Sequence, residues 1–216
     1  MADTRTRQIK QLLSEINRAG VRNRRVLTAI STVPREAFVR ETSLADAWAN
    51  RALPIEEGQT ISQPLIVGLM SQALELEGNE RILEIGTGSG YQAAILAELG
   101  AEVVTIERYP RLAERARERL EELGYSNVEV VVGDGTLGWP ERAPYHGIIV
   151  TAAAPHLPRP FEEQLSQVPG SRIVIPIGRA DEQELMIYER TKDGLREMSL
   201  GPVRFVPLIG QEGWQE

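Results

Sequence analysis

The chain has 216 residues, a net charge of −7 and 42% hydrophobic residues, values typical of one globular domain with a sizeable core. It has no cysteine, which excludes disulfides, a thiol nucleophile and thiolate metal sites. Its start lacks the apolar stretch of a signal peptide, and no window has the run of about 18 apolar residues that a membrane span needs. The composition therefore predicts a soluble cytoplasmic protein.

The first 40 residues are predicted to be helical and basic. Apolar residues recur at helical spacing over 9–19 and 26–33. Residues 1–40 carry nine Lys or Arg against three Asp or Glu, a balance of +6, so the rest of the chain carries −13. One basic cluster could contact nucleic acid or form a solvated helix face: Arg18, Arg22, Arg24 and Arg25. We favour the solvated face, because no aromatic residues interleave with these arginines.

Beyond residue 40 the pattern changes twice. Residues 40–62 look irregular, and helical spacing returns over 65–74. From residue 80 strand-like and helical patterns alternate, which predicts βαβ units and a parallel sheet. The strand-like runs are 81–85, 102–106, 128–132, 147–151 and 172–177. An Asp-Gly turn at 193–194 joins two later runs and predicts an antiparallel hairpin at the end of an α/β doubly wound, mostly parallel sheet.

The most informative segment is 82–91, which reads Ile-Leu-Glu-Ile-Gly-Thr-Gly-Ser-Gly-Tyr. An apolar strand meets three alternate glycines, which allow positive φ and close approach to a ligand. Two acids end or follow the next strands, Glu107 and Asp134. Because ligands of open parallel sheets bind beyond the carboxyl ends of the strands, these groups should share one crevice. There Glu107 would accept hydrogen bonds from ribose hydroxyls, and Asp134 from an adenine amino group.

The spacing of the glycines indicates which cofactor this turn binds. A dinucleotide fingerprint needs its third glycine three positions after the second, but position 91 is Tyr and the third glycine comes one residue early. Glu84 would repel a pyrophosphate and attract the ammonium group of an amino acid. The pattern therefore favours S-adenosyl-L-methionine over a nicotinamide cofactor. Taken singly, Glu107 could be a surface acid and Asp134 a turn residue.

Five segments together resemble the protein-L-isoaspartate O-methyltransferase family: 58–64 (GQTISQP), 82–91, 133–135 (GDG), 148–154 (IIVTAAA) and 203–208 (VRFVPL). The similarity runs from about residue 25 to about residue 210, and Thr60–Pro64 is its specific part. It implies a class I, Rossmann-like enzyme that methylates the free α-carboxylate of L-isoaspartyl residues in damaged proteins and peptides. The ester then cyclises to a succinimide, which starts repair to L-aspartyl. The resemblance also implies a monomer, and the composition leads us to expect no nucleic-acid or membrane partner.

The resemblance assigns roles to individual residues. Ser62 matches the active-site serine, and we expect it to orient the substrate carboxylate, which is already ionised at neutral pH. The alternative is that Ser62 is a helix N-cap ahead of Pro64. The expected cofactor-binding residues are Gln59, Thr60, Ile61, Glu84, Gly86, Thr87, Gly88, Ser89, Glu107, Arg108, Asp134, Gly135 and Gln183. No metal site is expected, since the two histidines lack ligand spacing.

We expect a single methyltransferase domain over residues 1–216. In it, 1–62 would cover the cofactor and the substrate cleft, 63–180 would form the cofactor-binding core, and 181–216 would form the C-terminal hairpin. Two other functions are weighed against this one. A methyltransferase acting on a small molecule or another polymer is disfavoured by Thr60–Pro64, and a non-enzymatic binding module by the intact acids and Ser62.

Overall fold

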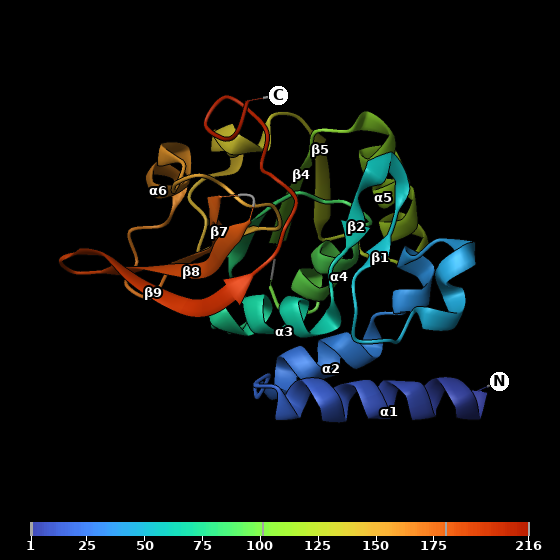
Figure 1. Cartoon of the computed structure of the whole chain (residues 1–216). Coiled ribbons are helices and arrows are strands. Elements are labelled where there is room, and N and C mark those ends of the chain that lie inside the picture. Colours follow the sequence, from blue (N-terminus) through green and yellow to red (C-terminus); the bar gives the residue numbers. More distant parts are fainter. Residues whose placement is uncertain (1, 101, 180, 216) are drawn as a thin grey trace.

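A seven-stranded sheet with the order β5-β4-β3-β6-β7-β8-β9 forms the centre of the protein (Figure 1). The computed structural model describes residues 2–100, 102–179 and 181–215. Its parallel strands are β3 (Arg81–Ile85), β4 (Glu102–Glu107), β5 (Val128–Val132), β6 (Gly147–Val150) and β7 (Arg172–Arg179). The antiparallel strands are β8 (Glu182–Thr191) and β9 (Gly194–Val203). The predicted α/β sheet with an antiparallel end is therefore confirmed.

The strand order places a crevice at the carboxyl end of β3. From β3 the chain leads outward to β4 and β5 on one side, and it then returns to β6 on the other side. Connections that leave in opposite directions from neighbouring strands open the space between them, which is where ligands of doubly wound sheets bind. The glycine turn follows β3, so the topology puts it at this position.

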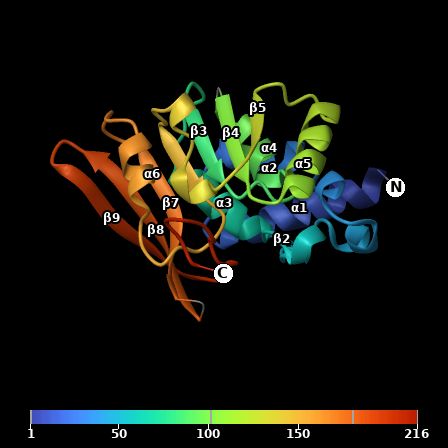
Figure 2. The same cartoon turned by 90° about the horizontal axis from the view of Figure 1, so that it is seen from above.

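Helices cover both faces of the sheet. One face packs against α3 (Pro64–Ala73), α4 (Tyr91–Ala97) and α5 (Pro110–Glu122), and the other against α6 (Arg159–Gln164). In α5 the buried residues are Leu112, Ala113, Ala116 and Leu120, which share one stripe at helical spacing. Figure 2 shows α5 at one end of the sheet and the β8–β9 hairpin at the other.

The N-terminal segment forms an additional layer below α3 (Figure 1). It consists of α1 (Ala2–Arg18) and α2 (Arg24–Thr32), and the side chain of Asn23 caps α2. The basic cluster of this segment is partly used in structural contacts. Arg25 donates hydrogen bonds to the carbonyls of Leu76 and Leu99, which follow α3 and α4 in the chain.

Residues 40–62 are more regular than predicted. They contain a two-stranded ribbon of β1 (Leu53–Pro54) and β2 (Thr60–Ile61), preceded by 3₁₀ turns at Arg35–Phe38 and Glu41–Asp46. Strands of two residues are too short to give an alternating pattern in the sequence, so the prediction of an irregular segment was wrong here. Within the described residues, no helix is long and apolar enough to cross a membrane.

Candidate active site

A cavity of about 630 Å³ lies at the carboxyl ends of β3 and β4. Its volume is within the range of roughly 300–1,000 Å³ that is common for small-molecule sites. Three remote parts of the chain form its walls: the ribbon end at 59–63, the glycine turn at 86–89 and the segment 202–209. Eleven of the fourteen predicted site residues line it: Gln59, Thr60, Ile61, Ser62, Gly86, Thr87, Gly88, Ser89, Glu107, Arg108 and Gly135.

The glycine turn has the conformation that its sequence predicts. Gly86, Gly88 and Gly90 have φ values of 94°, 53° and 88°. The amide of Gly86 donates to the carbonyl of Ile106 at 2.8 Å, and the hydroxyl of Thr151 donates to the carbonyl of Gly86 at 2.7 Å. A Cβ on Gly86 would lie 2.4 Å from that hydroxyl oxygen, whereas one on Gly88 would meet nothing closer than 3.7 Å. The turn is thus fixed to the sheet at Gly86, and Gly88 has space beside it.

Glu107 ends β4 and lines the cavity with a side chain that is almost fully buried. Its Oε2 accepts a hydrogen bond from the amide of Gly88 at 2.8 Å, and its Oε1 accepts one from the amide of Tyr109 at 3.0 Å. A carboxylate has about four acceptor positions, so each oxygen can accept a further hydrogen bond. This arrangement suits the two neighbouring hydroxyls of a ribose.

Ser62 lies between β2 and α3, and it lines the same cavity. Its hydroxyl has no hydrogen-bond partner among the described residues, whereas its carbonyl accepts a hydrogen bond from Arg35 at 3.0 Å. The alternative role as a helix N-cap does not apply. Gln63 is the N-cap residue of α3, and the side chain of Asn50 accepts the hydrogen bond from the amide of Leu65.

Sequence reasoning missed two residues that organise this site, Arg35 and Tyr91. Arg35 is fully buried, and its guanidinium lies 4.8 Å from the centre of the Tyr91 ring. Burial lowers the pKa of Arg35, although the nearby Tyr91 opposes this effect. Tyr91 begins α4 directly after the glycine turn and lines the cavity. The Val-Pro-Arg sequence at 33–35 gave no signal for this role, because all of these contacts are remote in sequence.

Glu84 does not line the cavity, contrary to the position expected for a group that attracts an ammonium ion. Its side chain has 0% exposure, and neither carboxyl oxygen has a hydrogen-bond partner within the described ranges. Burial, with the Glu107 carboxylate nearby, raises the pKa of Glu84 to about 8. The carboxyl group is therefore mostly neutral at pH 7, so Glu107 is the acidic group that the cavity presents.

Asp134 and Gln183 also lie outside the lining of this cavity. Asp134 accepts hydrogen bonds from the amides of Thr136 and Gln211, at 2.9 and 2.8 Å. Burial acts to raise the pKa of Asp134, but these hydrogen bonds outweigh it and lower the pKa. Gln183 exchanges two hydrogen bonds with the backbone of Phe205. Both side chains hold the C-terminal segment that walls the cavity.

The chain is similar to proteins of one family over nearly its full length. The family model described as protein-L-isoaspartate(D-aspartate) O-methyltransferase matches residues 7–213. Protein-L-isoaspartate O-methyltransferase 1 of Syntrophobacter fumaroxidans is 53% identical over 196 residues, which is 91% of each chain. The protein-L-isoaspartate O-methyltransferase of Methanoculleus marisnigri is 48% identical over 215 residues, covering 99% of this chain and 97% of that protein.

Two solved structures are similar to this chain. A protein-L-isoaspartate O-methyltransferase with 30% sequence identity superposes with a TM-score of 0.85, covering 95% of this chain and 67% of that chain. A Plasmodium falciparum protein solved in complex with S-adenosyl-L-homocysteine is 23% identical, has a TM-score of 0.79 and shares the fold over 93% of this chain and 97% of its own. This chain therefore belongs to the protein-L-isoaspartate(D-aspartate) O-methyltransferase family.

Proposed function

We propose that the cavity between Ser62 and the glycine turn is where this enzyme performs its family's reaction. As a member of that family, the chain is an S-adenosyl-L-methionine-dependent methyltransferase that methylates L-isoaspartyl residues and so initiates their repair. The observation that carries the assignment is one juxtaposition. Ser62, whose hydroxyl has no partner among the described residues, and the glycine turn at 86–89 line one cavity.

The residues of the cavity fit S-adenosyl-L-methionine. Glu107 lines the cavity and has acceptor capacity for a ribose diol. We assign cofactor contacts to the backbone of Gly86–Ser89, to Glu107, Arg108 and Gly135, and to the covering residues Gln59–Ile61. When bound, the cofactor supplies a methyl group that its sulfonium centre has already activated. Glu84, Asp134 and Gln183 would act indirectly, by supporting the turn and the C-terminal wall.

The substrate needs little chemical activation from the protein. The α-carboxylate of an isoaspartyl residue has an ordinary pKa of ~3.9 or below, so it is ionised at neutral pH without a general base. We infer that the Ser62 hydroxyl donates a hydrogen bond to one carboxylate oxygen and holds the other oxygen toward the methyl donor. Catalysis then depends on alignment and on the exclusion of water by the walls of the cavity.

We further propose that the enzyme acts as a monomer, as one domain, and on polypeptides rather than on nucleic acid. Damaged proteins and peptides that contain isoaspartyl residues would be its partners. The basic cluster near α2 does not argue for a nucleic-acid partner, since Arg25 is hydrogen-bonded within the protein. A cytoplasmic location stays a prediction from composition.

Methyl-labelled S-adenosyl-L-methionine and a matched pair of peptides, isoaspartyl and aspartyl, would test the reaction. We expect base-labile label on the isoaspartyl peptide only. Label on neither peptide, together with cofactor binding, would favour a methyltransferase with another substrate. Absence of cofactor binding would favour a non-enzymatic module. Ser62→Ala should reduce the labelling, and its matched control is Ser126→Ala, in an exposed turn before the amino end of β5.

A further inference from the structure

A second cavity of about 480 Å³ adjoins the active-site cavity. Its lining residues are Arg179, Asp181, Gln183, Arg204, Phe205, Pro207 and Trp214. Arg204, Phe205 and Pro207 line both cavities, so the segment 204–207 separates them and forms their common rim. A chain that leaves the first cavity over this rim would enter the second.

The rim is held firmly to the sheet. Gln183 accepts a hydrogen bond from the amide of Phe205 at 2.7 Å and donates one to its carbonyl at 3.2 Å. The carbonyl of Val206 accepts from the amide of Ala153 at 2.8 Å, and the indole N–H of Trp214 donates to the carbonyl of Ala153 at 3.1 Å. The second cavity therefore has a pre-organised wall, with one aromatic side chain anchored by its polar atom.

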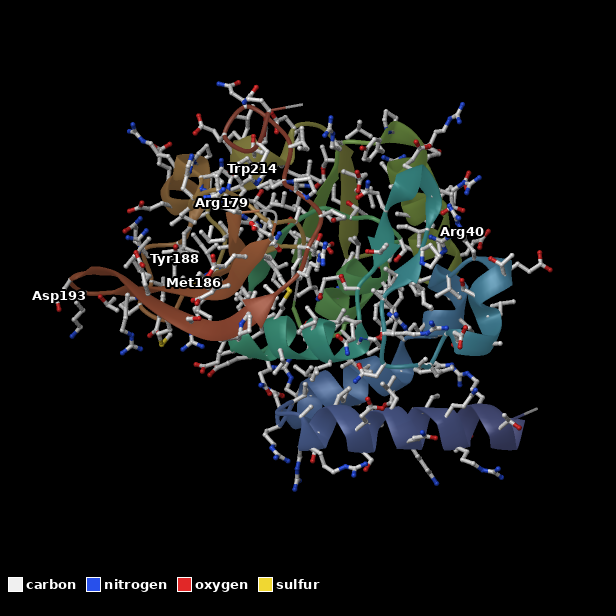
Figure 3. All side chains as sticks on the ribbon, in the orientation of Figure 1. Arg40, Arg179, Met186, Tyr188, Asp193 and Trp214 are labelled. Atoms are coloured by element: carbon white, nitrogen blue, oxygen red, sulfur yellow. The ribbon has the colours of Figure 1, made fainter. Side chains whose placement is uncertain are left out.

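The second cavity has more positive than negative side chains, although the chain as a whole is acidic. Arg179 and Arg204 contribute two exposed guanidinium groups, against one carboxylate from Asp181. Neither arginine forms an ion pair in the part of the chain that the structure describes, whereas Arg172, by contrast, binds both Glu75 and Glu189. Figure 3 shows Arg179 and Trp214 near each other, above the β8–β9 hairpin in this view, and both line the second cavity. These two guanidinium groups beside aromatic surface suit a carboxylate on a short apolar stem.

We propose that the second cavity is a subsite for a residue that flanks the isoaspartyl group, and that it favours an acidic side chain there. The inference rests on the proposed function, because it requires a polypeptide acceptor. Such an acceptor places its methylated carboxylate in the first cavity, and its neighbouring residues must continue across the rim. A flanking Glu would pack its methylene groups against Phe205 and Trp214, and its carboxylate would meet Arg179 and Arg204.

A set of isoaspartyl peptides tests this subsite. Each peptide carries Glu, Gln or Lys at one position near the isoaspartyl residue. The substituted position is varied over the three residues before and the three residues after it. At one position or more, kcat/KM should follow the order Glu, Gln, Lys. The kcat/KM of the Glu peptide should exceed that of the Gln peptide by about three- to tenfold at low salt. The difference should lie in KM rather than in kcat, and this ratio should fall as salt is added. Arg179→Gln should lower this ratio, because only Arg204 then remains to meet the carboxylate, and Arg179→Lys should retain more of it.

Lys192→Gln is the matched control, because it removes one exposed positive charge from the turn between β8 and β9. Its preference for Glu should equal that of the wild-type enzyme. Methylation without any preference at the flanking positions would contradict the subsite alone, and so would a preference that Arg179→Gln leaves unchanged. Failure to methylate every isoaspartyl peptide would contradict the proposed function and the subsite with it.

Discussion

Arg35 donates a hydrogen bond to the carbonyl oxygen of Ser62 at 3.0 Å, from a side chain that is fully buried. The same guanidinium donates to the carbonyls of Ala47 and Arg51, at 2.8 and 3.3 Å. Its face lies against Tyr91, the residue that follows the glycine turn. One side chain thus joins the loop that carries Ser62 to the residue that follows the glycine turn.

Replacing Arg35 should weaken both the fold and the site. Arg35→Lys keeps the charge but replaces the fork of donors by one ammonium group, so carbonyls would be left without partners. We expect the free energy of unfolding to fall by about 2–5 kcal/mol, and kcat to fall more than cofactor affinity does. Urea denaturation and steady-state kinetics would measure these effects. Arg18→Lys, on the surface of α1, should change the stability by less than about 0.5 kcal/mol; equal stability of both variants would contradict the role of Arg35.

Ser62→Ala should separate activity from stability. Because the hydroxyl has no partner among the described residues, its removal should change the free energy of unfolding by less than about 0.5 kcal/mol. The loss of an orienting hydrogen bond should lower kcat by roughly 10- to 100-fold. Initial rates with the isoaspartyl peptide and a urea titration would check both values. Unchanged turnover would refute the assignment of Ser62.

Two alanine substitutions in the glycine turn should behave differently. Gly86→Ala brings its Cβ within 2.4 Å of the Thr151 hydroxyl at a φ of 94°, so we expect about 2–4 kcal/mol of destabilisation. Gly88→Ala has space for its Cβ at a φ of 53°, so its cost should be about 1–2 kcal/mol. The methyl group of the Gly88→Ala variant would project beside the cavity, so this variant should bind S-adenosyl-L-homocysteine more weakly. Calorimetric titration and thermal unfolding of the two variants would show whether this order holds.

The buried Glu84 should make stability depend on pH. Its pKa is raised from 4.5 to about 8, so the folded protein holds a proton that the unfolded chain releases above pH 4.5. Stability should therefore fall as the pH rises from about 4.5 to about 8, by at most ~1.4 kcal/mol per pH unit. Glu84→Gln should remove this slope, which unfolding curves at several pH values would reveal. A slope that persists in the variant would assign the effect to other groups.

The sequence predicts those features that depend on short stretches of chain. The apolar runs of β3 and β6 and the spacing of the glycines predicted the sheet, the positive φ values and the position of the crevice. Glu107 was predicted to be a site residue because it ends a strand, and the structure shows that it lines the cavity.

The features that the sequence did not predict depend on contacts between remote residues. Asp134 is held by Gln211, 77 positions further along the chain, and no local pattern indicates that pairing. Glu84 was expected to present a charge, but its exposure depends on how α3 and α4 pack over the sheet. Arg35 lies in a short 3₁₀ turn with no motif, so only the folded chain shows that it reaches Ser62.

The wall formed by residues 202–209 has a consequence for the time at which the enzyme becomes active. A chain leaves the ribosome from its N-terminus, so the glycine turn and Ser62 emerge well before this wall does. Until β8 pairs with β7 and Gln183 binds Phe205, the cavity lacks one side. Nascent chains and fragments that end before this segment should therefore be unable to catalyse the reaction, even where the parallel strands have already formed.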